Sequence, residues 1–351
     1  MKLLLYKKNL IYLALLFIIF LLLSYRDFLD TLKFFLFHSY NFKMLPMDGY
    51  YKILIDYDNG NYSSVGSPWA NRFIPNYINF IYYKYLPCVE VSVIPQTINS
   101  KVYCSMFSIA LVNHIFTILS QFLLFIYLRF NLKREFSECL FGFCISYFFF
   151  QFLDRFGVDR FSIFFLLIFI TTINLKIFFR SLIIIMSILV NDKCLIFISA
   201  YYSVLLIDGY IDKRKFSYIL ENVICYFSIF FYLFFIFSFD NLKNDNAAPI
   251  NFIFDLYTLQ QYFVGFFSFH SISNSLAQIL LTICPFIILF NKKEILEYFN
   301  LKRIYFLILI LFLILGILIG GTGNTGRYMI FTFPISFPIF NFLFFQLFKK
   351  L

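Results

Sequence analysis

The sequence predicts an all-helical protein that crosses a membrane about ten times, with a long first extracytoplasmic loop that carries interfacial helices. Two observations predict this fold class. Of the 351 residues, 61% are hydrophobic and only 14% are charged, whereas a typical soluble protein is about 25% charged. The apolar residues also fall in runs of about the length that a membrane span needs. This composition argues against a soluble enzyme and against a disordered chain.

The first expected span follows a basic N-terminal stretch, Met1 to Asn9, and continues to about Leu23. The stretch resembles a signal peptide, but no small-residue cleavage site follows it, so we expect the span to be retained. Nine further apolar runs predict nine further spans. The run 181–190 is short, so that it and 194–208 could instead form one broken or re-entrant pair. The nine runs are 103–129, 139–153, 161–179, 181–190, 194–208, 217–239, 273–290, 304–320 and 328–347.

The distribution of basic residues supports this count. When ten spans alternate from a cytoplasmic N-terminus, most of the 29 Lys and Arg residues fall at cytoplasmic ends, as the positive-inside rule requires. The net charge of +10 is therefore a topology signal, and the sequence offers no basic and aromatic surface for nucleic acid. We expect a multi-pass protein of the cell (plasma or inner) membrane with both termini in the cytoplasm.

We expect the whole chain, 1–351, to form a single membrane-embedded domain. Between the first two spans, residues 25–102 form a long extracytoplasmic loop, and loops of this length are usually functional or carry helices of their own. Charged residues from Arg26 to Lys33 recur opposite apolar ones, which predicts an amphipathic helix at the interface or a continuation of the first span. Ser67-Pro68-Trp69 predicts the start of an aromatic-rich helix that continues through about Tyr85.

The seven cysteines are interpreted as small buried hydrophobic residues, because most lie in apolar runs and none forms a CxxC pair. Cys88 and Cys104 could pair if their loop meets an oxidising compartment, but we do not expect them to. The three histidines are too scattered to join the cysteines in a zinc site.

Polar residues gather in the loops that are expected outside the cell membrane. A set of ionisable residues at helix ends on one membrane face indicates a site, because such residues are costly at membrane depth. The runs are Asp48-Gly49-Tyr50-Tyr51, Asp56-Tyr57-Asp58, Asn71 to Pro75, Asp154 to Arg160, Asn191-Asp192-Lys193 and Gly320 to Arg327.

Each of these polar residues also has a simpler explanation, which the sequence leaves open. Capping and turn formation are common uses of Asp and Asn, surface salt bridges are common in loops, and long basic side chains mark membrane boundaries. These explanations are helix capping for Asp48, the Asn59-Gly60 turn for Asp56 and Asp58, a solvated loop for Asp154, Arg155, Asp159 and Arg160, and the membrane boundary for Lys193 and Arg327.

Together these residue types suit the transfer of a sugar from a lipid phosphate. A carboxylate can deprotonate an acceptor hydroxyl, cations can bind the phosphate leaving group, and aromatic rings can lie against the sugar. We expect Asp48 to be the catalytic base. The expected substrate-binding residues are Arg72, Lys193, Arg327, Asp56, Asp58, Asp154, Asp159, Arg160, Tyr50, Tyr51 and Trp69.

The layout resembles the GT-C superfamily of polytopic membrane glycosyltransferases: a cytoplasmic N-terminus, a long first outer loop with an early acidic residue, and an outer arginine before the last helix. The runs Asp48 to Tyr51, Arg72 to Pro75 and Gly326-Arg327-Tyr328 followed by Pro334 are similar to runs in uncharacterised bacterial membrane proteins of that type. The resemblance implies a polyprenyl- or dolichyl-phosphate sugar donor. It also implies a catalytic acidic residue in the first outer loop, which by position is Asp48.

The expected function is therefore transfer of a sugar from a polyprenyl-phosphate donor to an extracytoplasmic acceptor, a cell-envelope glycan or lipid. Two alternatives stay open: a polysaccharide polymerase or ligase, and a lipid or solute transporter or flippase. The expected partners are the lipid bilayer, the lipid-linked sugar and the acceptor, with no nucleic acid. A divalent cation could bind near Asp48, Asp56 and Asp58, although Asp-rich turns are commoner than metal sites.

Overall fold

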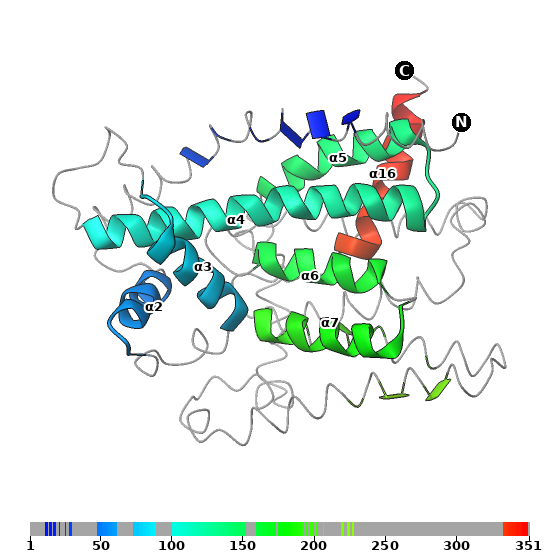
Figure 1. The fold of residues 1–351 in the computed structure, drawn as a ribbon. Coiled ribbons are helices and arrows are strands. Elements are labelled where there is room, and N and C mark those ends of the chain that lie inside the picture. The colour runs from blue at the N-terminus through cyan, green and yellow to red at the C-terminus, as the bar shows by residue number, and fades with distance from the viewer. Residues whose placement is uncertain are drawn as a thin grey trace, which may run out of the picture. The chain divides into compact units, whose positions relative to one another are not determined.

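Every secondary-structure element that the structure describes is a helix, and no strand occurs among these residues (Figure 1). The computed structural model confirms the all-helical class that the sequence predicts, while the number of about ten spans stays a prediction. The residues described are 48–61, 73–88, 100–151, 159–172, 175–191 and 333–349, with single positions between 11 and 29 and between 194 and 227.

The chain divides into two compact units. The first comprises residues 1–122 with 155–157, and the second comprises 123–154 with 158–351. The prediction of a single membrane-embedded domain stays a prediction.

Helix α4 is the one helix, among the described residues, that is long and apolar enough to cross a membrane. It spans Ser100–Ile126 and continues into a π-helical turn, Tyr127–Asn131, for a total of 32 residues. At 1.5 Å per residue this is about 48 Å, longer than the roughly 30 Å hydrocarbon core of a bilayer. The hydroxyl groups of Ser105, Thr117 and Ser120 donate to carbonyl oxygens of the same helix, as Thr117 does to Asn113 at 2.9 Å, so that they need no water.

Two short helices pack against each other in the first unit. α2 spans Asp48–Asp58 and α3 spans Phe73–Tyr85. Ile53 of α2 is buried, and the rings of Tyr57 and Phe80 meet edge to face with their centroids 5.7 Å apart. α3 ends at Tyr85, as the sequence predicts, two residues before Pro87. The helix ends there because a residue that precedes proline disfavours the helical conformation.

The first unit also holds a core between α4 and the described helical positions between 11 and 29, which we call the first helical segment. The Phe28 ring meets the Phe107 ring edge to face at a centroid distance of 5.4 Å. The hydroxyl of Ser108 donates to the Asn79 carbonyl oxygen at 2.7 Å and so ties α4 to α3. The buried members of this core are Phe28, Tyr103, Met106 and Ala110.

Cys88 and Cys104 form a disulfide, with their Cα atoms 5.4 Å apart. The expectation that these two cysteines stay unpaired is therefore wrong. They lie 16 residues apart in the sequence. Cys88, three residues after the end of α3, lies beside the first turns of α4, so that the two Cα atoms are within the distance that a disulfide needs. Cysteines in apolar runs are usually buried and unpaired, but this tendency does not tell which two cysteines lie close together in the fold.

In the second unit, α5 (Phe136–Gln151) and α16 (Phe333–Phe348) run antiparallel along their whole length. Phe150 near the end of α5 meets Phe333 at the start of α16, with ring centroids 5.2 Å apart. At the other end, Lys349 Nζ lies 2.9 Å from the Glu135 carboxylate. The offset and edge-to-face ring pairs between these points stabilise the contact.

Gly142 allows the two helices to approach closely. A Cβ atom at Gly142 would lie 2.9 Å from the side-chain atoms of Asn341 on α16. The Asn341 amide donates to the Glu138 carbonyl oxygen at 3.1 Å, so that the asparagine is held in place. Close approach at a small residue with an interhelical amide hydrogen bond is a typical way for apolar helices to associate in membranes.

The α6 and α7 helices form the second antiparallel pair of this unit. α6 spans Asp159–Thr171 and α7 spans Ile177–Val190. At one end, the Asn191 amide donates to the Ser162 hydroxyl at 3.0 Å. At the other, the Asn131 amide after α4 donates to the Thr171 carbonyl oxygen at 3.2 Å.

The predicted span 161–179 does not form one helix. α6 ends at Thr171, and α7 begins at Ile177. The Thr171 and Thr172 hydroxyls both donate to the Ile168 carbonyl oxygen, at 2.8 and 2.6 Å, and such side-chain bonds compete with the helix. Residues 177–179 therefore belong to α7, the same helix as the predicted span 181–190. This helix is longer than the predicted span but still shorter than α4.

α16 contains a proline in its interior, Pro338, one turn after Pro334. Proline has no backbone N–H, so residue 338 donates no hydrogen bond to the carbonyl oxygen of Pro334. Both prolines are buried.

Candidate functional site

The candidate site is the end of the α6–α7 pair where polar side chains are buried. We call it the α6–α7 polar end and define it by Asp159, Arg160, Ser162 and Asn191, which are 2%, 3%, 0% and 1% exposed. Asp159 and Arg160 are the first two residues of α6, where a carboxylate is favoured by the helix dipole. Asn191 follows α7 and is joined to α6 by its hydrogen bond to Ser162.

The structure brings together two of the polar runs that the sequence singles out. The run 154–160 contributes Asp159 and Arg160, and the run 191–193 contributes Asn191. The explanation that Asp159 and Arg160 belong to a solvated loop is wrong, because both are buried in the first turn of a helix. Asp154 and Lys193 of the same runs lie outside the described residues.

Burying the charged side chains of Asp159 and Arg160 at the α6–α7 polar end costs free energy, which is more than a merely structural role requires. Removing an ionised side chain from water costs several kcal/mol, roughly, unless partners compensate. Asp159 and Arg160 are adjacent residues of opposite charge, and each has an interaction partner. An arginine held in this way presents a planar, permanently charged fork, the group that best matches a phosphate.

The acidic residues of the first unit lie along α2. Asp48 is the first residue of the helix, and its side chain is not described. Asp56 is half-buried and Asp58 is exposed. The Asn59-Gly60 turn forms as the sequence suggests: Gly60 has a φ of +75°, and its N–H donates to the Tyr57 carbonyl oxygen at 3.1 Å.

The length of α2 limits which carboxylates could share a cation. Asp48 and Asp58 are the first and last residues of an 11-residue helix, so their backbones lie about 15 Å apart along its axis. A cation that needs oxygen ligands within about 2.6 Å cannot bind both carboxylates. Among the described residues, no group of three or more His, Cys, Asp or Glu side chains lies close enough to hold a metal ion.

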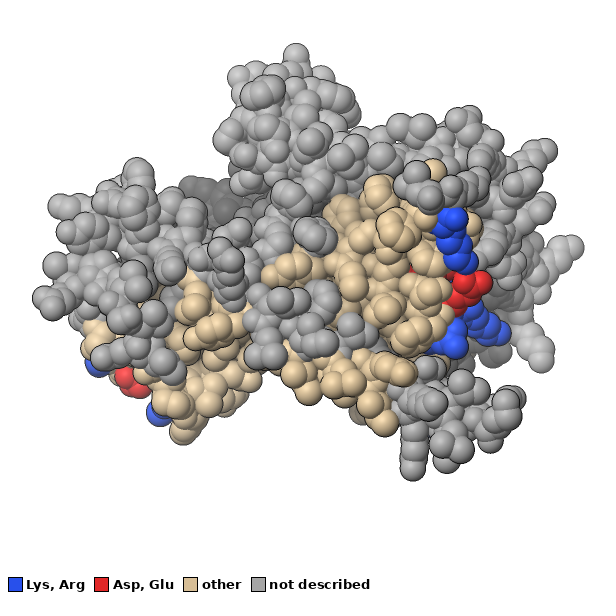
Figure 2. Space-filling model, turned by 90° about the horizontal axis from the view of Figure 1, so that it is seen from above, with Lys and Arg blue, Asp and Glu red and all other residues tan. Residues whose placement is uncertain are grey.

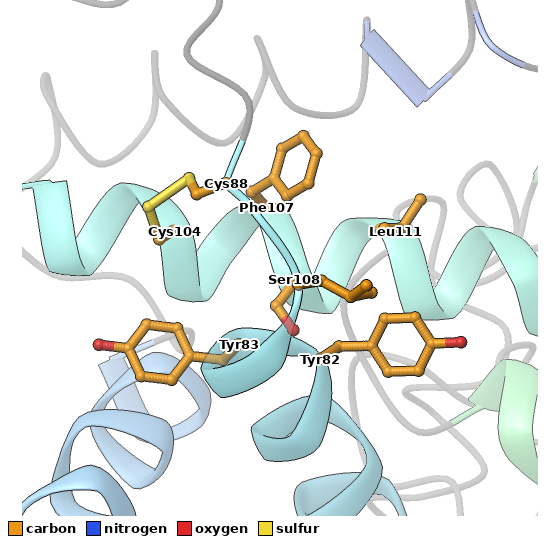
Figure 3. Close-up of a pocket in the computed structure, with 8 residues that line it drawn as sticks. Tyr82, Tyr83, Cys88, Cys104, Phe107, Ser108 and Leu111 are labelled. Carbon is orange, nitrogen blue, oxygen red and sulfur yellow. A yellow bond between two sulfur atoms is a disulfide. The ribbon is translucent and has the colours of Figure 1, made fainter.

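Tyr83 of α3 is a polar group near the acidic end of α2 that the sequence analysis does not include. Burial raises the pKa of Tyr83 above its ordinary value of 10.0, and the nearby Asp58 carboxylate raises it further. Figure 3 shows Tyr82 and Tyr83 beside Ser108 and the Cys88–Cys104 disulfide. The space between them is about 10 Å³, which is the room of one water molecule. The aromatic run in the sequence is the only signal that pointed to these tyrosines.

A larger cavity, of about 160 Å³, lies in the first unit between the first helical segment and α4. It is lined mainly by apolar side chains, with the His114 imidazole and the Tyr25 ring among them. A cavity of this size accommodates one benzene ring. It could therefore hold a short segment of an apolar chain.

The remaining predicted site residues cannot be placed in this geometry. Tyr50 and Tyr51 belong to α2, and their side chains are not described. The residues of the prediction that lie outside the described part of the chain are Trp69, Arg72, Asp154, Lys193 and Arg327.

In the part of the chain that the structure describes, every element is a helix and one helix is long and apolar enough to cross a membrane. The chain matches no protein-family model, and no curated protein or solved structure matches it. Function must therefore be inferred from the site.

Proposed function

We propose that this chain is a multi-pass membrane enzyme that transfers a sugar from a polyprenyl-phosphate donor to an extracytoplasmic acceptor, a cell-envelope glycan or lipid. The observation that carries the proposal is the burial of Asp159 and Arg160 at the α6–α7 polar end. Ionisable residues buried within a set of apolar helices are expensive to keep, and they commonly mark substrate sites in membrane proteins.

The contacts between helix ends support the proposed membrane placement of about ten spans. Ends that the alternation of spans assigns to the cytoplasm meet each other, as Asn131 meets Thr171 and Lys349 meets Glu135. Ends assigned to the outside also meet, as Asn191 meets Ser162. One span more or fewer between these helices would place some of these contacting ends on opposite membrane faces, whereas a change of two spans would not.

The proposed chemistry uses groups that the chain supplies. The acceptor hydroxyl attacks the anomeric carbon of the donor sugar, the bond from that carbon to the phosphate oxygen breaks, and the lipid phosphate leaves. The hydroxyl proton passes to the carboxylate of Asp48, the proposed general base. Arg160, with Arg72, Lys193 and Arg327, would bind the phosphate as its charge grows.

The experiment that tests the proposal is an assay of sugar transfer by the purified protein in liposomes. The donor is a polyprenyl phosphate that carries a radiolabelled sugar, and the acceptor is a cell-envelope glycan or lipid fraction. We expect Asp48→Asn to abolish transfer without reducing the amount of protein in the membrane. The matched control is Glu135→Gln, which removes an exposed carboxylate from the other end of the spans and should leave transfer unchanged.

Two results would contradict the proposal. Full transfer by Asp48→Asn would remove Asp48 from the mechanism. Movement of the lipid or solute across liposomes that contain only this protein, with no covalent product, would instead favour a transporter or flippase.

A further inference from the structure

We propose that the end of α4, together with the loop before α5 and the end of α16, binds the headgroup of an anionic phospholipid in the cytoplasmic leaflet. We call this surface the basic end and define it by Arg129, Lys133, Arg134 and Lys349. Lys133 and Lys349 are exposed, Arg129 is half-buried, and Arg134 is buried beneath them. The inference rests on the membrane placement proposed above and is independent of sugar transfer.

The basic end is assembled by contacts within the second unit. The Arg129 guanidinium donates to the Arg134 carbonyl oxygen at 2.6 Å. The Arg134 guanidinium lies 5.7 Å from the centre of the Phe342 ring, and Lys349 Nζ lies 4.8 Å from the centre of the Phe345 ring. These contacts bring basic residues from two segments some 200 positions apart in the sequence to one place.

Two carboxylates accompany the four cations, and the balance is positive. Glu135 lies beside Lys349, and Glu138 is buried in the first turn of α5. The Lys349–Glu135 pair is exposed, with 47% and 64% of the two side chains accessible, so the pair is weak and Lys349 can turn to a phosphate at little cost. Figure 2 shows Lys, Arg, Asp and Glu side chains gathered at the described surface beside a broad stretch of other residue types.

Large apolar side chains are exposed next to these charges. Phe130 directly follows Arg129, and Phe344, Leu347 and Phe348 belong to the last turns of α16; they are 47%, 47%, 60% and 65% exposed. A phospholipid has this same arrangement, a phosphate next to acyl chains. Basic side chains that lie beside exposed apolar side chains are therefore complementary to a phospholipid, whose phosphate they can bind while the apolar side chains contact its acyl chains.

The disulfide at the other end of α4 indicates which leaflet the basic end meets. Disulfides persist in oxidising compartments, so the Cys88–Cys104 bond places the start of α4 outside the cytoplasm. Arg129 lies 25 residues after Cys104, which is about 38 Å along the helix. A bilayer with its headgroups is roughly 40–45 Å thick. Arg129 then lies at the cytoplasmic headgroups, where anionic lipids are concentrated.

Lys133 offers a way to remove one of these charges without disturbing the fold. Its φ is 56°, in the left-handed region that a glycine normally occupies at a helix end. Lysine is unfavourable there, so Lys133→Gly should preserve or improve the backbone conformation while deleting the cation. Lys349→Gln likewise removes an exposed charge, and it breaks only the surface pair with Glu135 and the contact with the Phe345 ring.

The test measures phospholipid binding to the full-length protein in nanodiscs. Nanodiscs of phosphatidylcholine alone are compared with nanodiscs that also contain phosphatidylglycerol, and native mass spectrometry counts the phosphatidylglycerol molecules retained. We expect a loss of affinity of about fivefold for each of Lys133→Gly and Lys349→Gln. The matched control is Lys101→Gln, an exposed lysine in the first turn of α4 at the opposite end, which should change nothing.

Three outcomes would overturn the inference. They are equal phosphatidylglycerol retention by all variants, an equal loss in Lys101→Gln, and displacement of the lipid by millimolar inorganic phosphate, which would indicate a soluble anion. A protein that does not enter nanodiscs at all would contradict the membrane placement itself. Normal lipid retention by a protein that transfers no sugar would contradict only the proposed enzymatic function.

Discussion

The two helix pairs of the second unit are held together in different ways. α5 and α16 meet over their whole length through aromatic rings and one close approach at Gly142. α6 and α7 instead bury Asp159, Arg160 and a hydrogen-bonded Asn191 at one end. The first pair is also joined by polar contacts, the Asn341–Glu138 hydrogen bond and the exposed Lys349–Glu135 ion pair. The second pair differs in that an acidic and a basic side chain are buried side by side in the first turn of one helix, and this is why we assign them a role in binding.

The largest expected effect breaks the α5–α16 pair. Leucine at Gly142 would place its Cβ atom 2.9 Å from Asn341, whose side chain is fixed by its bond to the Glu138 carbonyl oxygen. We expect Gly142→Leu to lower the free energy of unfolding by about 3 kcal/mol, because overpacking forces the helices apart. Chemical unfolding of the purified protein in detergent measures this loss.

A double variant separates the steric effect from other effects at this position. Asn341→Ala removes the side chain that the new atoms would meet, so Gly142→Ala with Asn341→Ala should be more stable than the sum of the two single variants predicts. Wild-type stability in Gly142→Leu would show that α5 and α16 do not approach closely.

The second prediction concerns the polar end of the other pair. Arg160→Gln should lower kcat/KM for the polyprenyl-phosphate donor by about 100-fold, because it removes a charged donor to the phosphate. The transfer assay in liposomes measures it. The double variant Arg160→Gln with Asp159→Asn removes both charges from the α6–α7 polar end. It should therefore be more stable than Arg160→Gln alone, while its sugar transfer stays low.

A control arginine sharpens this comparison. Arg180 is also buried, but it lies in the first turn of α7, at the opposite end from the polar end. Arg180→Gln should lower stability and leave the kcat/KM of the folded fraction unchanged. Equal losses of kcat/KM in both variants would show that Arg160 is structural.

The smallest expected effect weakens the α6–α7 pair. Asn191→Ala removes its hydrogen bond to Ser162 and should lower the free energy of unfolding by about 1 kcal/mol. Ser162→Ala should cost a similar amount, and the double variant less than the sum, because the two side chains share one bond. Additive losses, measured by the same unfolding assay, would mean that the two residues act separately.

The sequence predicts local features of this chain better than distant ones. The helical class, the helix over 103–129 and the end of α3 at Tyr85 follow from apolar runs and proline. The contact of α5 with α16 does not, because helices of similar aromatic composition offer no sign of which one pairs with which. The break between α6 and α7 was missed because hydrophobicity alone does not register the bonds of Thr171 and Thr172 to the helix carbonyl.

The candidate site was predicted only in part, for a related reason. Charge and position singled out Asp159 and Arg160, but only the structure shows that they are buried and that Asn191 is tied to α6 close beside them. The disulfide was missed because pairing depends on Cys88 lying beside the first turns of α4, which the spacing of the two cysteines does not encode.

Pro338 gives the last described helix a mechanical property of its own. The hydrogen bond that would stiffen α16 between Pro334 and Pro338 cannot form, so the helix bends at lower cost at this turn than elsewhere. Ring contacts with α5 lie on both sides of the turn, Phe333 with Phe150 before it and Phe345 with Phe141 after it. Any bend of α16 is therefore expected at Pro338, between two points at which the helix is fastened to its partner.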